Sequence, residues 1–216
     1  MAEAKHTVSV LCSDPDHPVN AWLQRWAHDN ESRADIVIAR DRADLTGGDF
    51  LFLISCHQII GTDIRALYRH TLVVHASDLP KGRGWSPMIW EALSGASSIT
   101  VSLLNAEDGV DCGEIWQRRR FALDGTELLG ELNAKLFAIE LELMDWALAH
   151  CDNAAPQPQS GEPSVWPKRR PSDGEINPSE PLSASFDTIR LADPQRYPAF
   201  FTHRGARYAI RLEKLP

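Results

Sequence analysis

Two residues that can exchange protons, His75 and Asp111, each follow a short apolar segment of the chain. His75 ends the run 71–75, and a loop that contains proline and glycine, residues 76–85, comes next. Asp111 lies in an acidic, glycine-containing loop, residues 108–114, which follows a second apolar run. If these runs are neighbouring strands of an open α/β sheet, both loops leave the edge at which such sheets bind ligands. We therefore predict that the two side chains meet, as a base and the carboxylate that orients it.

The elements that must position this pair alternate between strand-like and helix-like patterns over the first hundred residues. Five segments are short, apolar and rich in β-branched residues, as buried strands are. These predicted strands are residues 7–12, 35–39, 50–55, 71–75 and 99–104. Helices are predicted over 19–30, where Val19, Leu23 and Trp26 share one face, and over 87–93, which begins with a proline. The alternation predicts an α/β fold, a Rossmann-like, mostly parallel sheet with flanking helices.

In the second half of the chain, the sequence predicts one long helix, and the composition then becomes rich in proline. Leucine and isoleucine recur at three- and four-residue spacing over 127–149, which indicates a helix that packs along the sheet. Residues 154–181 hold seven prolines and few large apolar side chains, which favours an extended surface connection. The strand-like segments 199–202 and 207–212 flank Arg204-Gly205 and predict a closing β-hairpin. The predicted divisions are a main domain, 1–150, a proline-rich connection, 151–183, and a small C-terminal extension with the hairpin, 184–216.

The composition is that of a globular chain with no general affinity for polyanions. Hydrophobic residues make up 43% and charged residues 24% of the 216 residues, and no apolar run reaches the roughly 20 residues of a membrane helix. Residues 1–6 show no secretory leader pattern, so we expect a cytoplasmic protein. The net charge of −8 disfavours broad electrostatic contact with nucleic acid. The four cysteines stand far apart and form no Cys-x-x-Cys pair, which predicts free thiols rather than a zinc site.

The proton-transfer pair alone fits a hydrolase, a transferase or a lyase, but the residues around it are more specific. Three segments follow one another in order: His75-Ala-Ser-Asp-Leu-Pro-Lys-Gly-Arg-Gly-Trp-Ser-Pro87, Ile99-Thr-Val-Ser-Leu103 and Asp108-Gly-Val-Asp-Cys-Gly-Glu-Ile115. Together they resemble the folate-dependent formyltransferase family, whose pattern is Asn-x-His, Leu-Pro, a basic Arg-Gly loop and Asp-x-Gly. The resemblance covers residues 50–150 well and the first fifty residues by pattern only. It implies that the main domain is a formyltransferase catalytic domain.

The end of the chain resembles one branch of that family. Lys168-Arg-Arg-Pro-Ser-Asp-Gly-Glu-Ile176, Phe186-Asp-Thr-Ile-Arg190 and Tyr197-Pro-Ala-Phe-Phe201 are similar to the short C-terminal extension of sugar N-formyltransferases. Methionyl-tRNA formyltransferases instead add a barrel domain, whereas 66 residues follow position 150 here. The 75–87 segment resembles the pseudaminic-acid-pathway type, whose acceptor is a UDP-linked amino sugar used for surface glycans. The partners implied are a nucleotide-linked amino sugar, no nucleic acid beyond that nucleotide and no membrane; the oligomeric state stays open, a homodimer included.

The resemblance also implies a role for individual residues. N10-formyltetrahydrofolate would be the cosubstrate, with no metal, and an amine of the acceptor would attack its formyl carbon. His75 would move protons and support the oxyanion, and Asp111 would hold and polarise the imidazole. The residues implied beside the folate are Ser55, Cys56, Ile59, Ile60 and Asp108. The residues implied beside the acceptor are Ser77, Lys81, Arg83, Gly84, Trp85 and Arg190.

One position departs from the family pattern. Where the family has the asparagine of Asn-x-His, this chain has Val73, which cannot donate a hydrogen bond to the formyl oxygen. Loss of one oxyanion donor typically costs about 10² to 10³ in rate. Ser77, Asn105 or a water are candidates to replace it. Two other hypotheses therefore stay open: a catalytically impaired folate- or nucleotide-sugar-binding protein, and a formyltransferase with another amine acceptor, such as an amino acid, a purine precursor or methionyl-tRNA.

Overall fold

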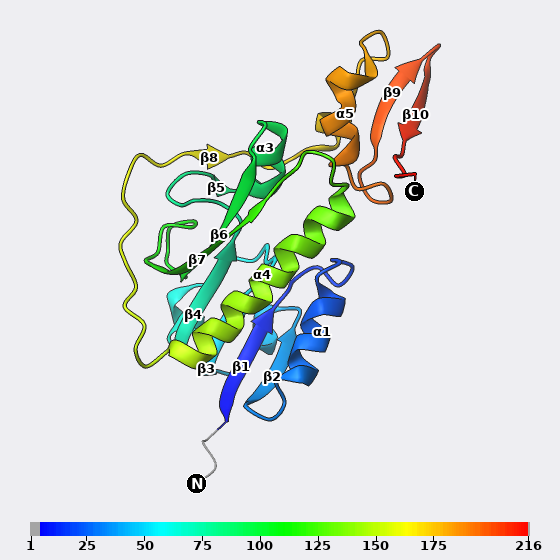
Figure 1. Ribbon diagram of the computed structural model, residues 1–216. Helices are drawn as coiled ribbons and strands as arrows, with labels where there is room; N and C mark the ends of the chain where they lie inside the picture. Colours follow the sequence, from blue (N-terminus) through cyan, green and yellow to red (C-terminus); the bar gives the residue numbers. More distant parts are fainter. Residues whose placement is uncertain (1–4, 216) are drawn as a thin grey trace.

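A computed structural model describes residues 5–215 and places a six-stranded sheet at the centre of the molecule (Figure 1). The strands are β1 (His6–Leu11), β2 (Ala34–Ala39), β3 (Gly48–Leu53), β4 (Tyr68–His75), β6 (Ser98–Asn105) and β7 (Ile115–Ala122). They lie in the order β2-β1-β3-β4-β6-β7. The first four are parallel, β6 is antiparallel to β4, and β7 is antiparallel to β6. The predicted fold class, an α/β fold with a mostly parallel sheet, is confirmed.

Both faces of the central strands are buried, which explains why a strand such as β3 is mostly an apolar run. Successive residues of a strand point to opposite faces. In β3, Phe50 and Phe52 therefore belong to one apolar cluster, and Leu51 and Leu53 belong to another. The cluster around Phe50 and Phe52 also contains buried residues of the long helix, including Leu132. This two-sided core is the rigid support from which the strand ends carry their loops.

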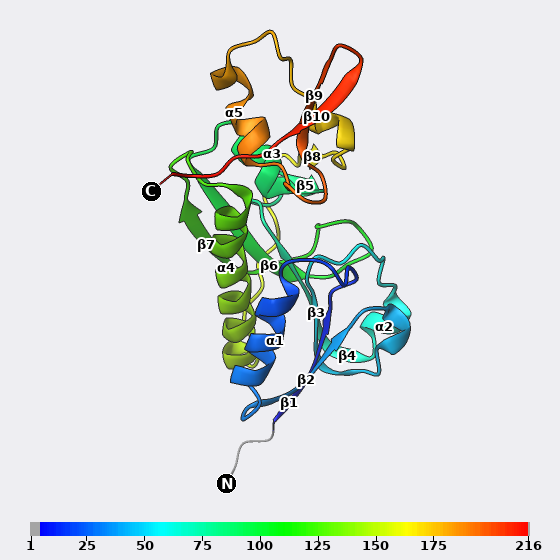
Figure 2. The same cartoon turned by 90° about the vertical axis from the view of Figure 1, so that its right-hand side faces the viewer.

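Helices cover the sheet, as Figure 1 and Figure 2 show. The α-helices are α1 (Asn20–Asp29), α2 (Thr62–Arg65), α3 (Pro87–Leu93), α4 (Leu129–His150) and α5 (Leu182–Arg190), and 3₁₀ turns occur at Arg42–Asp44 and Pro171–Gly174. α1 and α4 lie side by side on one face of the sheet. α4 is the predicted long helix, and its start, two residues later than predicted, follows an extended residue at Leu128. Helix α2 was not predicted, because a helix of one turn leaves no periodic apolar pattern.

Strand β7 is absent from the sequence prediction, because three consecutive arginines, 118–120, interrupt its apolar alternation. The arginines point alternately to the two faces of the edge of the sheet. Nε of Arg119 donates to Glu142 of α4 at 2.6 Å, whereas Nε of Arg120 donates to Ser98 of β6 at 2.7 Å. Charged side chains on an edge strand also discourage pairing with another chain. The basic run therefore belongs to an edge strand of the sheet.

The proline-rich connection makes specific contacts with the loop that follows β4. Its residues Val165–Trp166 form strand β8, which pairs in parallel with β5 (Arg83–Gly84) of that loop. The backbone N–H of Arg83 donates to the carbonyl of Ser164 at 2.9 Å, and that of Trp85 donates to the carbonyl of Trp166 at 3.2 Å. The connection thus returns to the end of the sheet at which His75 lies.

The predicted hairpin closes the chain as β9 (Ala199–His203) and β10 (Ala206–Ile210). Its two-residue turn has positive φ at Arg204, 50°, and at Gly205, 81°, as a type I′ turn requires. The predicted division of the chain into three parts remains a prediction.

Two further features concern the chain as a whole. Among residues 5–215, none of the helices combines the length and the apolar character that crossing a bilayer demands. The four cysteines of this part are free thiols. The prediction that the chain begins without a secretory leader concerns residues 1–4 above all, and these lie outside the described residues.

Candidate active site

The structure brings His75 and Asp111 together at one end of the sheet. His75 is the last residue of β4, and Asp111 lies in the loop between β6 and β7. The distance between His75 Nδ1 and Asp111 Oδ1 is 3.5 Å, which is an ion-pair distance. The two side chains are 8% and 11% exposed, so water is largely kept from the pair. Charge interactions are stronger at such a site than in bulk solvent.

The His75 ring is held on both sides by oxygen atoms. Its Nε2 lies 2.9 Å from the carbonyl oxygen of Gly82, and its Nδ1 faces Asp111. Both oxygens are acceptors, and a neutral imidazole carries only one N–H. One ring nitrogen can therefore donate in the neutral imidazole, and both can donate once the ring has taken up a proton. The ring is placed to receive and release protons beside the loop that contains Gly82.

Asp111 is fixed by three separate segments. Its Oδ2 accepts from the backbone N–H of Gly84 at 2.9 Å, and its backbone carbonyl accepts from Gln159 Nε2 at 2.8 Å. Its φ of 51° lies in the left-handed region, which aspartate tolerates better than most residues. Two residues on, a Cβ at Gly113 would collide with the carbonyl of Asn105, so this position requires glycine. The Asp-x-Gly motif therefore has a local structural reason.

The loop after β4, residues 76–85, is the third part of the site, and we call it the Arg-Gly loop. The connection ties it down: the backbone N–H of Gly82 donates to Ser164 Oγ at 2.9 Å, and Arg83 Nη2 donates to Gln159 Oε1 at 2.7 Å. Gln159 therefore links this loop to Asp111. Sequence reasoning missed both Gln159 and Ser164, because neither stands in a pattern that distinguishes it from its polar, proline-rich surroundings.

Comparisons with known proteins show the family to which the chain belongs. Residues 2–148 match the formyl transferase family. The chain belongs to this family. A methionyl-tRNA formyltransferase of Finegoldia magna is 29% identical over 166 residues, 74% of this chain and 53% of that protein. The chain thus spans about half the length of the curated relatives that it matches first.

Solved structures share the fold of this formyl transferase family member. A methionyl-tRNA formyltransferase from Clostridium thermocellum gives a TM-score of 0.82 at 24% identity, over 97% of this chain and 93% of that chain. Aquifex aeolicus HypX in complex with tetrahydrofolic acid gives 0.77 at 18%, over 97% and 38%. A likely sugar N-formyltransferase from Mycobacterium tuberculosis gives 0.75 at 17%, over 98% of both. At these identities the likeness concerns the fold alone.

The residues that family resemblance assigns to the folate lie in two loops that a single arginine joins. Arg65 of α2 donates to the carbonyl of Ile60 at 2.7 Å and to Asp108 Oδ1 at 2.6 Å. The Arg65 guanidinium, followed by the Thr62 hydroxyl, holds the pKa of Asp108 below its usual range. Ile59 is 82% exposed beside the buried Ile60 and so presents an apolar side chain to solvent. Arg65, which the sequence analysis missed, fixes the two loops relative to each other.

The other two residues of this group lie just after β3. Ser55 has a φ of 47°, so the chain turns sharply at this point. Cys56 donates from its Sγ to the carbonyl of Gln58 at 3.5 Å, and burial raises the pKa of its thiol. Neither Ser55 nor Cys56 makes a hydrogen bond or an ion pair with His75 or Asp111, and their assignment to the folate stays a prediction.

The residues assigned to the acceptor lie mostly in the Arg-Gly loop. Gly84 contacts Asp111 directly, and Arg83 reaches it through Gln159. The ring of Trp85 is partly exposed, with Lys168 Nζ 4.9 Å from its centroid. Lys81 is exposed and helps to line a cavity beside the loop. These residues surround the His75 end of the sheet, and their contacts with an acceptor stay a prediction.

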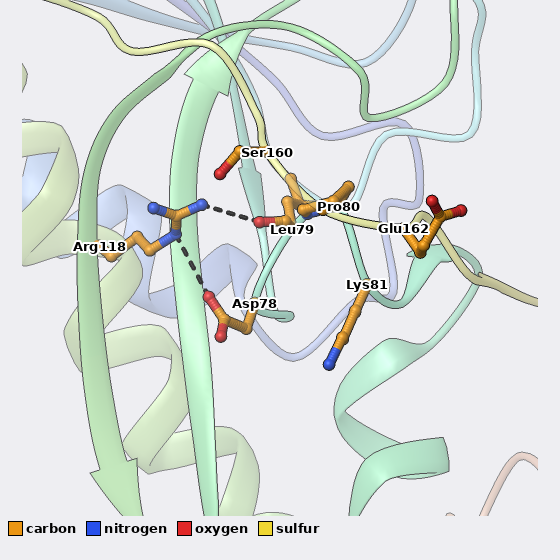
Figure 3. A pocket seen from close by; sticks show the side chains of 8 residues that line it. Asp78, Leu79, Pro80, Lys81, Arg118, Ser160 and Glu162 are labelled. Atoms are coloured by element: carbon orange, nitrogen blue, oxygen red, sulfur yellow. Dashed lines mark hydrogen bonds and ion pairs between the residues drawn. The ribbon is translucent and has the colours of Figure 1, made fainter.

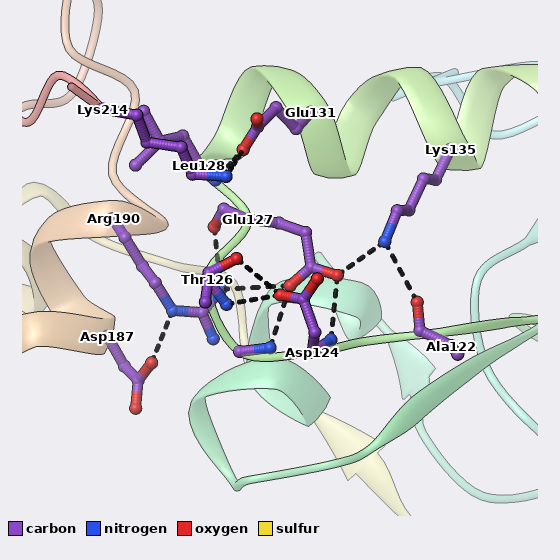
Figure 4. A network of polar contacts seen from close by, with 11 residues as sticks. Ala122, Asp124, Thr126, Glu127, Leu128, Glu131, Lys135, Asp187, Arg190 and Lys214 are labelled. Carbon is purple, nitrogen blue, oxygen red and sulfur yellow. Dashed lines mark hydrogen bonds and ion pairs between the residues drawn. The ribbon is translucent and has the colours of Figure 1, made fainter. Parts of the chain in front are cut away.

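Arg190 was assigned to the acceptor substrate, but its side chain is used in contacts within the protein. Its guanidinium is only 4% exposed and donates to Asp187 Oδ1 at 2.6 Å and to the carbonyl of Glu127 at 2.9 Å (Figure 4). These bonds join α5 to the segment that precedes α4, and Lys135 completes the network by donating to Glu127 at 2.6 Å. The side chain therefore holds the C-terminal extension in place, and none of these contacts supports a role in acceptor binding.

A cavity of about 410 Å³ opens beside the Arg-Gly loop, but it does not include His75 or Asp111 (Figure 3). Its lining consists of Asp78, Leu79, Pro80, Lys81, Arg118, Ser160, Gly161 and Glu162. Arg118 is already engaged, with Asp78 Oδ1 3.4 Å from its Nε and the Leu79 carbonyl 2.8 Å from its Nη2. The cavity therefore offers mixed charge rather than a free cationic site. Within residues 5–215, no cluster of His, Cys, Asp and Glu is arranged to bind a metal ion.

The position of Val73 leaves two side chains to compare as replacement donors. Val73 packs against apolar clusters that contain Leu53 and Leu104. The carbonyl oxygen of the Asn105 side chain accepts from Trp116 Nε1 at 2.7 Å, so that amide is already oriented by a partner. Ser77 is 0% exposed, and its Oγ has no hydrogen-bond partner among the described residues. The free hydroxyl of Ser77, two residues beyond His75, is the better candidate.

Proposed function

We propose that this chain transfers a formyl group from N10-formyltetrahydrofolate to the amine of a nucleotide-linked amino sugar, UDP-linked in the first instance, as in surface glycan biosynthesis. The observation that carries the proposal is the shielded His75–Asp111 pair, tied to the Arg-Gly loop through Gly82 and Gly84. A formyl transfer needs proton movement and a charge-stabilised tetrahedral state, and this pair can serve both needs.

In the proposed reaction, the acceptor nitrogen attacks the formyl carbon and forms a C–N bond. The tetrahedral oxyanion then collapses, and the bond between that carbon and N10 of the folate breaks. His75 supplies the proton that N10 gains, so that tetrahydrofolate leaves. Because Nδ1 faces Asp111, Nε2 is the nitrogen that must contact the substrate. For this, Nε2 must give up its hydrogen bond with the Gly82 carbonyl and form one with the substrate instead. Asp111 keeps the ring oriented and balances its positive charge.

The folate is a suitable cosubstrate for the surroundings of this pair. Arg65 fixes the two loops assigned to it, and exposed Ile59 lies in one of them. A planar, partly polar pterin needs both an apolar contact and nearby hydrogen-bonding groups, as small-molecule sites generally supply. Tetrahydrofolic acid is the molecule named in the HypX complex, which has the same fold.

Three observations support an amino sugar nucleotide as the acceptor. The net charge of −8 is unfavourable for a polyanion as large as tRNA. Locally, Lys168 and the partly exposed Trp85 ring form a cationic and aromatic pair beside the Arg-Gly loop. Such a pair suits a diphosphate next to a base. The neighbour from M. tuberculosis is described as a likely sugar N-formyltransferase. The pseudaminic-acid type is the finer form of this proposal.

Methionyl-tRNA is the second candidate acceptor, because a specific observation favours it. The relative from F. magna and the neighbour from C. thermocellum are both named methionyl-tRNA formyltransferases. Lys168 and Arg170 are exposed basic residues of the kind that contact phosphates.

One assay separates these functions. The protein is incubated with N10-formyltetrahydrofolate and, in parallel, with a panel of UDP- and dTDP-linked amino sugars and with methionyl-tRNA. Tetrahydrofolate release and the mass gain of one formyl group are followed, with His75→Asn as the inactive control. Formylation of an amino sugar nucleotide is expected. Formylation of methionyl-tRNA alone would replace the proposal by the second candidate, and folate binding without turnover would favour a catalytically impaired binding protein.

A further inference from the structure

Three side chains from separate segments meet around the α-carbon of Gly82. A Cβ at this glycine would lie 3.0 Å from Trp166 Nε1, 3.0 Å from the Cβ of Ser77 and 3.2 Å from Glu91 Oε1. We call Ser77, Glu91 and Trp166 the Gly82 cluster. Glu91 comes from α3 and Trp166 from β8, and neither was singled out from the sequence. Because the carbonyl of Gly82 contacts His75 Nε2, the cluster borders the same residue that holds the histidine.

The polar atoms of the Gly82 cluster are not satisfied by the protein. Ser77 Oγ and Trp166 Nε1 are buried without a hydrogen-bond partner among the described residues. Buried polar groups in native proteins nearly always have partners, and exceptions call for a bound molecule or a chemical role. Trp166 is held by its ring, which stacks on Trp90 with centroids 5.8 Å apart. Its N–H is thus kept in place while it lacks an acceptor.

Glu91 is a carboxylate that lacks a cation. Within residues 5–215 it makes no ion pair, and the charged groups of the neighbouring segments do not neutralise it. Asp78, in the Arg-Gly loop, is also acidic, Arg118 of β7 is engaged with Asp78, and Arg169 of the connection lies over the Trp90 ring. Burial, with a smaller contribution from Asp78, raises the pKa of Glu91 to about 7. A carboxylate in this state can accept a hydrogen bond from a neutral amine and take up a proton from it near neutral pH.

Asp111 cannot take that role, because both of its carboxylate oxygens are occupied. Oδ1 faces His75 and Oδ2 accepts from the backbone N–H of Gly84. Glu91 is the carboxylate near Gly82 whose oxygens make no hydrogen bond in the described part of the chain. The two acids therefore differ in their contacts: Asp111 orients the imidazole, whereas Glu91 lies beside Gly82 with no hydrogen-bond partner among the described residues.

We propose that Glu91 binds the acceptor amine and takes the proton that its nitrogen loses when it attacks the formyl carbon, while the indole N–H of Trp166 donates to an acceptor oxygen near that amine. This inference rests on the proposed formyl transfer. The proton balance is complete: the amine proton goes to Glu91, and the proton that N10 gains comes from His75. The substrate class is an amine that carries hydroxyl or ether oxygens close to its nitrogen, as an amino sugar does.

The decisive variant is Glu91→Gln, which keeps the size of the side chain and removes its ability to accept a proton. The measurement is kcat/KM for the acceptor that the wild type formylates best in the panel above, between pH 5.5 and 9. We expect a loss of about 10²-fold or more, together with loss of the rise in rate centred near pH 7. Tetrahydrofolate binding, followed by tryptophan fluorescence, and the urea midpoint are expected to stay at wild-type values. Glu31→Gln, the same change at an exposed glutamate after α1, is the matched control.

Trp166→Phe provides a second test that keeps the ring and removes only the N–H. We expect KM for the acceptor to rise about tenfold, with kcat changed much less. The outcomes are distinct. A Glu91→Gln protein with wild-type kcat/KM and an unchanged pH profile overturns the role of Glu91 and leaves the proposed function standing. A wild-type protein that formylates no acceptor overturns the proposed function, and the inference about Glu91 falls with it.

Discussion

At the residue scale, the site depends on two side chains that lie 36 positions apart in the chain. His75→Asn and Asp111→Asn keep similar shapes but remove, respectively, the proton carrier and the charge that orients it. We expect each to lower kcat/KM by about 10² to 10⁴. Loss of folding is not expected, because neither side chain belongs to the apolar core. Stopped-flow or steady-state release of tetrahydrofolate measures the effect, and wild-type rates in both variants would contradict the assignment.

The His75–Asp111 contact was predictable because the two residues follow neighbouring strands, but the expected reason was wrong: β6 runs antiparallel to β4, so the two strands end at opposite edges of the sheet, and the contact depends on the path of the loop after β6. The contacts of Arg190 were not predictable, because its sequence surroundings give no information about Glu127 and Asp187, which engage its guanidinium. Glu91 could not be distinguished in the sequence either, since a glutamate in a short helix is usually solvated. Its half-buried position beside Gly82 is shared with Trp166, which lies 75 residues away in the sequence. The chemical role of a residue can thus be predicted from its type only where the fold also shows which residues surround it.

Val73 and Ser77 allow the missing oxyanion donor to be tested directly. If the Ser77 hydroxyl has taken over from the family asparagine, Ser77→Ala should lower kcat by about 10² to 10³. Adding Val73→Asn to that variant should restore part of the loss, because an amide then replaces the hydroxyl. The amide costs about 1–3 kcal/mol of stability wherever it lacks a partner, which a urea titration would detect. Full activity of Ser77→Ala would leave a backbone N–H or a water as the donor.

At the element scale, Arg65 of α2 joins the loop after β3 to the loop after β6. Arg65→Ala removes both bonds, to the Ile60 carbonyl and to Asp108. We expect tetrahydrofolate affinity to fall by about 10- to 100-fold, because each loop must then be ordered when the ligand binds. Fluorescence titration measures the change. Arg42→Ala, in an exposed turn, is the matched control; if Arg65→Ala binds folate as tightly as the wild type, the two loops do not form the folate site.

A helix or strand could be predicted from the sequence when its apolar residues recur at a regular spacing. The strands β1, β2, β3 and β6 and the helix α4 were predicted to within two residues at each end, because apolar residues recur regularly in them. β4 begins at Tyr68, three residues before the predicted start, because Arg69 and His70 interrupt its apolar run. β7 was not predicted, because Arg118–Arg120 interrupt its apolar pattern, and the pairing of β8 with β5 was not predicted either. A two-residue strand has no period, so nothing in the sequence shows that the connection returns to the Arg-Gly loop. That return matters, because Gln159 and Trp166 reach the site through it.

At the scale of the whole molecule, a buried carboxylic acid on α4 makes the stability of the fold depend on pH. Glu140 lies on the buried face of α4 among apolar residues such as Leu136 and Met144, and its Oε2 has no hydrogen-bond partner among residues 5–215. Burial raises the pKa of its carboxyl to about 8, from an ordinary value of 4.5. Between these two values the folded protein keeps the proton and the unfolded chain has released it. The free energy of unfolding therefore falls as the pH rises through this window, and the fall ends above about pH 8.

Glu140→Gln removes this dependence, because a neutral amide has no proton to lose. We expect the variant to match the wild type near pH 5 and to be more stable at pH 8 by on the order of 2–4 kcal/mol. Urea unfolding at pH 5, 6.5 and 8 measures the difference. Glu142→Gln, two positions along on an exposed part of the same helix, should leave the wild-type pH dependence in place. Parallel stability curves for the wild type and Glu140→Gln would mean that the Glu140 carboxyl is ionised and solvated in the folded protein, and that α4 does not cover the sheet at this point.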